Sequence, residues 1–264
     1  MALPYDMGNA GDLVKHGLLA EFGQWWCRHE HRPLRFLDPF GGQPWVSPPK
    51  VEVTRRVQAL HSCGLSAAQP DPVNRYYGIS FVVLNAVKAS GGSAEVFVSD
   101  CDPEARHALE EKGFHPLAAA GFSPSDGFSI LNAQVAGDLL LLDPFAKFLL
   151  QRASDVIPRI AKACETIACV LLVLNLDPNN SVGRRYRDLR STYLGHAWSL
   201  HCPRLPDRGV CGESKYEVDV LLAWRRLADH PAGNDLQDRL DTYAQVLSKV
   251  LDTKIVFSNA DERT

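Results

Sequence analysis

The sequence lacks the cysteine and histidine spacing on which disulfide frameworks and structural zinc sites depend. Its seven cysteines are odd in number and scattered, and none forms a Cys-x-x-Cys pair. The nine histidines show no metal-ligand spacing. His201, Cys202 and Cys211 come nearest to such a cluster, and a chance grouping explains them. These absences argue against a disulfide scaffold or a zinc site and favour a reducing compartment, the cytoplasm.

Long apolar runs, targeting segments and a strong charge of one sign are also absent. No stretch approaches the length of a membrane span, and no basic segment followed by an apolar core predicts a signal peptide. The formal net charge of −3 gives no overall attraction to nucleic acid, so any such surface would have to be local. With 264 residues, 45% hydrophobic and 22% charged, the chain fits one large α/β domain.

The most informative stretch is residues 138–145, which read DLLLLDPF. Four consecutive leucines are typical of a parallel strand that is buried on both faces. The strand ends in Asp143, Pro144 and Phe145. Ligands of open α/β sheets bind beyond the carboxyl ends of the strands, where an acid could accept a hydrogen bond from an amine and an aromatic ring could stack on a flat ligand. A plain strand end with a proline turn remains the alternative.

Further strands end in acidic residues. The strand 34–38 ends in Asp38 and runs into Pro39-Phe40-Gly41-Gly42, which suits either a close approach of backbone to a ligand or an ordinary turn. The strand 94–99 is followed by Asp100, and an acid there is the usual partner of a ribose diol in nucleotide sites. A further apolar strand covers 168–174. These strands alternate with helices, which predicts an α/β layer fold.

Two other regions set the predicted organisation. Residues 45–92 lack strand patterning and contain helical segments, which predicts an inserted helical subdomain within a single domain of residues 1–264. The patterns at Tyr216–Trp224 and Lys254–Phe257 predict a late antiparallel hairpin at the sheet edge.

Some polar residues allow both a structural and a functional interpretation. Asp12 is a predicted N-cap of an amphipathic first helix, and Lys15 in the first turn opposes the helix dipole, which favours an anionic partner. Ser80 fits either an N-cap or a ligand hydrogen bond. Beyond the strand 168–174 lies a basic cluster that predicts either phosphate contact or a solvated helix face. It comprises Arg184, Arg185, Arg187 and Arg190.

Six fragments, taken in order, resemble the RlmJ family of 23S ribosomal RNA adenine-N6 methyltransferases. They are GNAGDLVKH (8–16), FLDPFGG (36–42), RYYGIS (75–80), Asp100, DGF (126–128) and DPF (143–145). In that family the corresponding segments read roughly GNHADVLKH, YLDTHAGAG, RYYPGS, a Glu, DGF and DPPY. The matches extend from the first helix to about residue 150, and beyond it only the order of elements matches. The resemblance implies a Rossmann-like class I methyltransferase sheet, mostly parallel with the late antiparallel hairpin.

The resemblance also implies a cofactor, S-adenosylmethionine, and roles for individual residues. Asp143 would bind the target amine, Phe145 would stack on the target base, and Pro144 would complete the motif. The basic cluster would contact an RNA substrate. The implied cofactor-binding residues are Lys15, His16, Asp38, Gly41, Ser80, Asp100, Asp126 and Gly127.

The departures from the family pattern leave alternatives open. The DPPY motif has two prolines and this chain has one, while Phe40 stands where the family has a His. One alternative is the same fold with another acceptor, such as DNA or a small molecule. Another is a non-catalytic protein that resembles the three-Cys-motif partner proteins.

Overall fold

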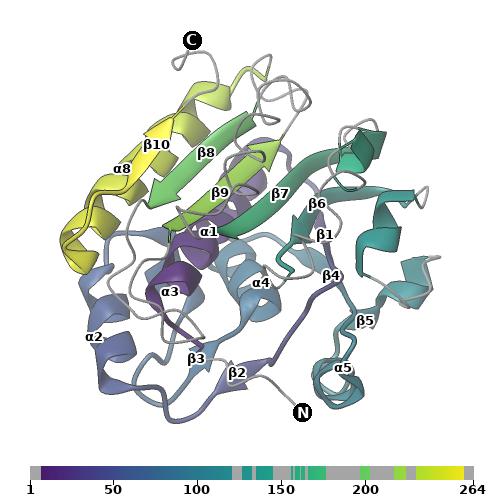
Figure 1. Ribbon diagram of the computed structural model, residues 1–264, viewed down its shortest axis with the longest axis horizontal. Helices are drawn as coiled ribbons and strands as arrows, with labels where there is room; N and C mark the ends of the chain where they lie inside the picture. The colour runs from purple at the N-terminus through teal and green to yellow at the C-terminus, as the bar shows by residue number, and fades with distance from the viewer. Residues whose placement is uncertain are drawn as a thin grey trace.

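The protein is described by a computed structural model, which covers residues 7–120, 127–132, 135–144, 156, 158–160, 162–163, 166–176, 197–202, 217–223 and 230–258. Within these ranges a sheet of eight strands runs in the order β10-β8-β9-β7-β6-β1-β4-β5 (Figure 1). Its strands are β1 (Leu34–Asp38), β4 (Ala94–Val98), β5 (His115–Pro116), β6 (Gly137–Leu142), β7 (Ile167–Leu176), β8 (Ala197–Cys202), β9 (Glu217–Ala223) and β10 (Val256–Ser258).

The strands from β5 to β7 are parallel, and those from β9 outward are antiparallel to their neighbours. The predicted late antiparallel hairpin is present, but β8 and β9 form it, and the pairing of β9 with β10 that the sequence patterns suggested was wrong. Instead β8 lies between them and pairs with both. The sequence interpretation missed β8 because it read no strand in residues 197–202.

The leucine run of β6 is buried on both faces, as predicted. Leu139 and Leu141 belong to one hydrophobic core, and Leu140 and Leu142 to the other. Successive side chains of a strand point to opposite faces, so one strand contributes to both cores. β6 is a central strand, and because it is parallel to β1 and β4, its carboxyl end lies on the same side of the sheet as theirs.

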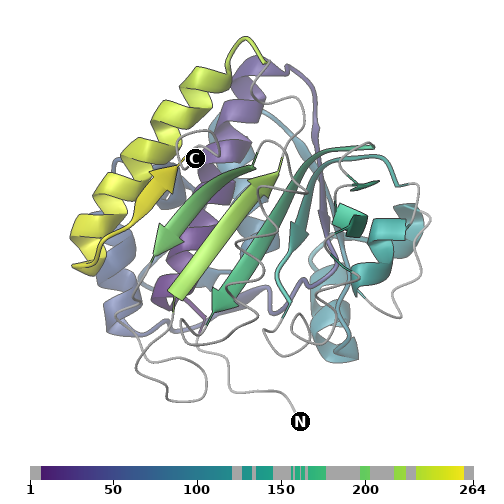
Figure 2. The ribbon, with the colours of Figure 1, turned by 45° about the horizontal axis from the view of Figure 1, so that its top comes forward.

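Three long helices cover one face of the sheet: α1 (Ala10–His29), α4 (Ile79–Ala89) and α8 (Gly233–Leu251) (Figure 2). The prediction that α1 is amphipathic was wrong, because sixteen of its 20 residues are buried. α4 and α8 both pack against α1, so it lies inside the molecule. The other face is covered by η2 (Gly127–Asn132) and by helical residues in the range 156–163.

The region 45–92 contains α2 (Val51–Ala59), α3 (Gly64–Ala68) and α4, together with a two-stranded ribbon of β2 (Trp45–Val46) and β3 (Tyr76–Tyr77). The expectation of no strands there was therefore wrong. All three helices contribute side chains to the core that contains α1. The remaining elements are α5 (Pro103–Glu110) and η1 (Leu117–Ala120). Among the described residues, no helix is long and apolar enough to cross a membrane.

Candidate functional site

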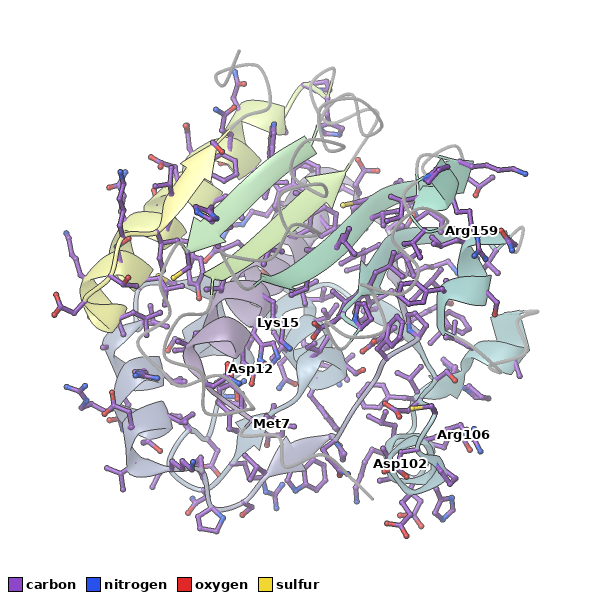
Figure 3. All side chains as sticks on the ribbon, viewed as in Figure 1. Met7, Asp12, Lys15, Asp102, Arg106 and Arg159 are labelled. Atoms are coloured by element: carbon purple, nitrogen blue, oxygen red, sulfur yellow. The ribbon has the colours of Figure 1, made fainter. Side chains whose placement is uncertain are left out.

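The amino-terminal turn of α1 holds the first group of polar site residues. Its N-cap is Asn9, whose side chain accepts from the backbone N–H of Asp12 at 3.0 Å, so the prediction that Asp12 caps the helix was wrong. The carboxylate of Asp12 instead accepts from the backbone N–H of Gly8 at 2.7 Å and pairs with Lys15 at 2.8 Å. Figure 3 marks Asp12 and Lys15 on successive turns of the helix. Asp12 therefore helps to position the lysine.

The ammonium group of Lys15 also pairs with the carboxylate of Asp143, just beyond the end of β6. Lys15 Nζ lies 2.5 Å from Asp143 Oδ2, and the two side chains are only 9% and 12% exposed. The anionic partner that the position of Lys15 predicted is therefore a pair of carboxylates, on Asp12 and Asp143. Pro144 is buried next to Asp143 in the chain, and Phe145 lies outside the described residues.

Asp38, at the end of β1, is a completely buried carboxyl group. Its Oδ1 accepts from the backbone N–H of Phe40 at 3.1 Å, and its Oδ2 accepts from Ser80 Oγ at 3.2 Å. Burial raises the pKa of Asp38 to about 7, and the negative charges of Asp143 and Asp100 also raise it. Ser80 is not the N-cap of α4, since Gly78 occupies that position, so its hydroxyl is available to Asp38.

Asp100, after β4, holds the loop that follows β1. Its Oδ2 accepts from the backbone N–H of Gly42 at 2.9 Å, and its Oδ1 accepts from that of Asp102 at 2.7 Å. Gly42 has a φ of +62°, which favours glycine. At Gly41 a Cβ atom would lie 2.7 Å from Leu109 Cδ1. Local packing therefore explains the glycine pair without a ligand.

Gly127 faces the aromatic ring of Phe40 across the site. A Cβ atom at Gly127 would lie 2.5 Å from Phe40 Cζ, and the ring also meets Phe128 edge-on at 5.4 Å between centroids. Phe40 therefore covers the backbone at Gly127, while Asp126 lies outside the described residues. The sequence interpretation treated Phe40 only as a departure from a family pattern and missed this contact.

His16 is buried behind Lys15 and stacks on Tyr76. The rings are nearly parallel, with centroids 5.5 Å apart, and His16 Nδ1 shares a hydrogen bond of 2.8 Å with the hydroxyl of Tyr76. Burial lowers the pKa of His16 to about 3, although Asp12 raises it in part, so the ring is neutral at physiological pH. His16 is connected to the other site residues through its neighbours Lys15 and Asp12, which both affect its pKa.

Lys15, Asp38, Ser80, Asp100 and Asp143 are therefore linked by hydrogen bonds, ion pairs or electrostatic interactions at one edge of the sheet. The four arginines 184, 185, 187 and 190 lie outside the described residues, so the predicted basic cluster stays a prediction. Asp12 and Tyr76 are additional members of the site. The i,i+3 spacing of Asp12 and Lys15 was the available signal for the first.

The first acid of the leucine stretch lies at the opposite end of β6. Asp138 accepts from both terminal nitrogens of the Arg32 guanidinium, at 2.9 and 2.7 Å, and from the backbone N–H of Arg35 at 2.8 Å. β6 runs from Gly137 to Leu142, so Asp138 lies at the amino end of the strand and Asp143 follows its carboxyl end. Asp138 ties β6 to the segment before β1.

No family model and no curated protein matches the sequence. Solved structures do match. A Legionella pneumophila protein of the family DUF519 is 13% identical, with a TM-score of 0.68, and the match covers 96% of this chain and 97% of that one. A probable spermidine synthase from Corynebacterium glutamicum is 9% identical, with a TM-score of 0.51, covering 92% and 75%. The predicted fold class is confirmed: the chain has a Rossmann-like, mostly parallel sheet flanked by helices, and it shares this fold with both proteins.

Proposed function

We propose that the protein is a methyltransferase that uses S-adenosylmethionine to methylate an adenine N6 in 23S ribosomal RNA. The observation that carries the proposal is the Lys15–Asp143 pair at the carboxyl end of β6. Asp143 follows β6, Asp38 ends the adjacent strand β1, and Asp100 follows β4, the next strand of the sheet. Three acids therefore lie at the carboxyl ends of three successive parallel strands. This is the sheet edge at which α/β folds bind nucleotide-like ligands.

The residues present fit the proposed cofactor. The carboxylate of Asp100 is only partly used by its two backbone donors, since each oxygen can accept a second hydrogen bond. It therefore retains capacity for the two ribose hydroxyls. Phe40, which packs over the backbone of Gly127 and against Phe128, provides an apolar ring at the site. S-adenosylmethionine would supply a methyl group made electrophilic by its sulfonium sulfur.

Asp143 is the residue that would hold the target amine. Lys15 engages Oδ2 of Asp143, which leaves Oδ1 to accept an N–H of the amine and to orient its nitrogen for in-line transfer. The new bond would form between the nitrogen and the methyl carbon as the carbon–sulfur bond breaks, and the proton of the nitrogen would pass to water. Phe145 is the proposed stacking partner of a base that has left its helix.

The first test is calorimetric titration with S-adenosylmethionine and with its demethylated product. We expect a dissociation constant in the micromolar range, equivalent to about −8 kcal/mol, and loss of this binding in Asp100→Ala. Failure of the wild-type protein to bind either compound would refute the cofactor assignment. Methylation of protein-free 23S ribosomal RNA, read as transfer of a labelled methyl group, then tests the acceptor.

A further inference from the structure

A cluster of cationic and aromatic side chains lies on the surface beside the ribbon of β2 and β3. We call it the Trp45 patch, and it consists of Trp45, Arg75, Tyr77 and Lys112. The guanidinium of Arg75 lies 5.1 Å from the centre of the Trp45 ring, and the ammonium of Lys112 lies 5.0 Å from it. Cations at this distance are attracted by the indole ring, so one tryptophan holds two positive charges at the surface.

Neither cation of the Trp45 patch has a carboxylate partner within 4.0 Å among the described residues. Other arginines of the described ranges do have one: Arg32 pairs with Asp138, Arg55 with Glu52 and Arg239 with Glu21. Arg75 and Lys112 are also exposed, while Trp45 and Tyr77 are half-buried. Two like charges kept close together without compensation constitute a surface that is suited to an anion.

The Trp45 patch adjoins the candidate site through the backbone. Trp45 follows Gly42 by three residues, which limits the separation of their Cα atoms to about 11 Å. On the other strand, Tyr77 precedes Ser80 by three residues. The two approaches are joined, because the backbone N–H of Gly78 donates to the carbonyl of Pro44 at 2.8 Å. The Trp45 patch therefore lies close to the residues of the candidate site, within the length of an extended ligand.

We propose that the Trp45 patch binds the sugar–phosphate backbone of the RNA strand that flanks the target base. The proposal rests on the function proposed above. Arg75 and Lys112 would each neutralise a phosphate. Tyr77, a partly exposed residue whose ring packs against Trp45 and Phe81, would contact a neighbouring base. An unpaired strand fits better than a duplex, since the target base must leave its helix to reach Asp143.

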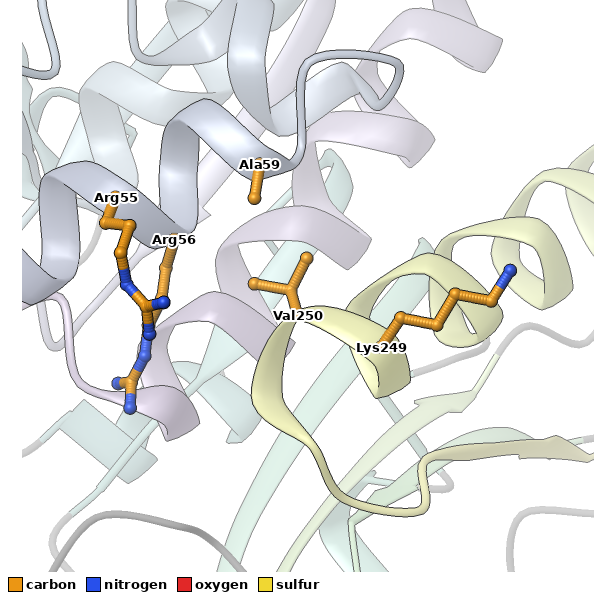
Figure 4. A pocket seen from close by; sticks show the side chains of 5 residues that line it. All are labelled: Arg55, Arg56, Ala59, Lys249 and Val250. Atoms are coloured by element: carbon orange, nitrogen blue, oxygen red, sulfur yellow. The ribbon is translucent and has the colours of Figure 1, made fainter.

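The test compares two double variants that each remove two positive charges. R75Q/K112Q alters the Trp45 patch, and R55Q/K249Q alters a separate basic pocket. Arg55 and Lys249 line a pocket of about 280 Å³ between α2 and α8, together with Arg56, Ala59 and Val250 (Figure 4). That pocket lies on the flank of the molecule away from α5, so it serves as a matched control for net charge.

Binding of protein-free 23S ribosomal RNA is measured between 50 and 200 mM salt, on the order of the range over which phosphate contacts lose affinity. We expect R75Q/K112Q to weaken binding about tenfold and to reduce the slope of log K against log salt by roughly 1.4, the value for two phosphates of a single strand. R55Q/K249Q should keep the wild-type slope. The charge-conserving R75K/K112R should keep most of the affinity.

The outcomes separate the Trp45 patch from the proposed function. Equal RNA binding by wild type and R75Q/K112Q, or equal losses in both double variants, would refute the patch while leaving the methyltransferase assignment intact. An absence of RNA binding by the wild type would refute both the RNA acceptor and the patch. Titration with the demethylated cofactor should give the same affinity for all variants, because none of the altered side chains belongs to the cofactor site.

Discussion

Two buried ionisable groups of the site have pKa values displaced in opposite senses from their ordinary values. Asp38 is buried at the end of β1, and its pKa is raised to about 7. His16 is buried on α1, and its pKa is lowered to about 3. Both shifts arise mainly because burial removes the charged form from water. The folded state therefore favours the neutral form of each group.

The two groups oppose each other in the dependence of stability on pH. Between about 4 and 7 the folded state binds more protons at Asp38 than the unfolded state, so stability falls as pH rises. Between about 3 and 6.5 the unfolded state binds more protons at His16, so stability rises with pH. We expect Asp38→Asn to leave a positive slope of up to roughly 1.4 kcal/mol per pH unit near pH 5.

Urea unfolding at several pH values gives the free energy of unfolding and therefore its slope against pH. The same measurement on His16→Asn should give the opposite result, a stability that declines as pH rises from 5 to 7, with a slope of roughly the same size. Parallel curves for the wild type and both variants would contradict the assignment of the two shifts.

Asp143 and Asp138 allow a matched comparison at the two ends of one strand. Asp143→Ala removes the proposed partner of the target amine, so we expect transfer to fall by at least about 10³-fold with little change in cofactor binding. Asp138→Ala removes the partner of Arg32 at the far end of β6. It should lower stability by about 1–3 kcal/mol and leave transfer by the folded protein unchanged.

Methyl transfer and chemical unfolding are measured for both variants. Full activity of Asp143→Ala would exclude its assigned role. A loss of transfer in Asp138→Ala without a loss of stability would indicate that both ends of the strand affect the reaction.

At the scale of elements, α1 is central because three other helices, α3, α4 and α8, pack around it. At Gly17 a Cβ atom would lie 1.8 Å from Cζ of Tyr243, so the absence of a side chain allows α8 to approach. Tyr243 also donates its hydroxyl hydrogen to the carbonyl of Leu13 at 2.5 Å. The close approach of α1 and α8 encloses the segment that carries Lys15 and His16.

Gly17→Ala tests this packing against Gly23→Ala in the same helix. We expect Gly17→Ala to cost about 3 kcal/mol or more, because the ring of Tyr243 must be displaced. At Gly23 the nearest atom to a Cβ is Val87 Cγ2 at 3.2 Å, and alanine favours a helix, so the change should be within about 1 kcal/mol. Denaturant unfolding gives both values, and similar costs at the two positions would contradict the packing argument.

The helix ends illustrate what could be predicted from sequence. Asn9 and Asp12 are both good capping residues at the start of α1, and propensity alone could not choose between them. Similarly, Gly78 caps α4 although Ser80 is the stronger side-chain candidate. In both cases other side-chain contacts decide, because Asp12 pairs with Lys15 one turn further along the same helix and Ser80 donates to Asp38 at the end of β1.

At the scale of the whole molecule, four parallel strands, β1, β4, β6 and β7, were readable from the sequence, whereas the two-residue strand β5 and the order of the antiparallel strands were not. Leucine runs and terminal acids identified β1, β4 and β6 together with their shared carboxyl edge. The position of β8 between β9 and β10 depends on pairing between distant segments, which local periodicity does not encode. The Phe40–Gly127 contact was hidden for the same reason, since it joins segments that are far apart in the chain.

Ligand binding should stabilise the folded molecule as a whole. With S-adenosylmethionine at about 100 times its dissociation constant, we expect roughly 2.7 kcal/mol of added stability, and a rise in melting temperature of several degrees. Asp100→Ala should show no such rise. A thermal unfolding scan measures both, and an equal rise in the variant would place the cofactor away from the end of β4.

The ion pairs at the two ends of β6 have a mechanical consequence. Lys15 lies near the start of α1 and Arg32 lies just after its end, and they bind Asp143 and Asp138 respectively. An ion pair therefore joins α1 or the segment just after it to β6 at each end of the strand. The two ion pairs oppose a shift of β6, and of Asp143 with it, along the strand direction. The position of Asp143 relative to Lys15 is therefore set by the fold, and the proposed acceptor would bind to a carboxylate that is already in place.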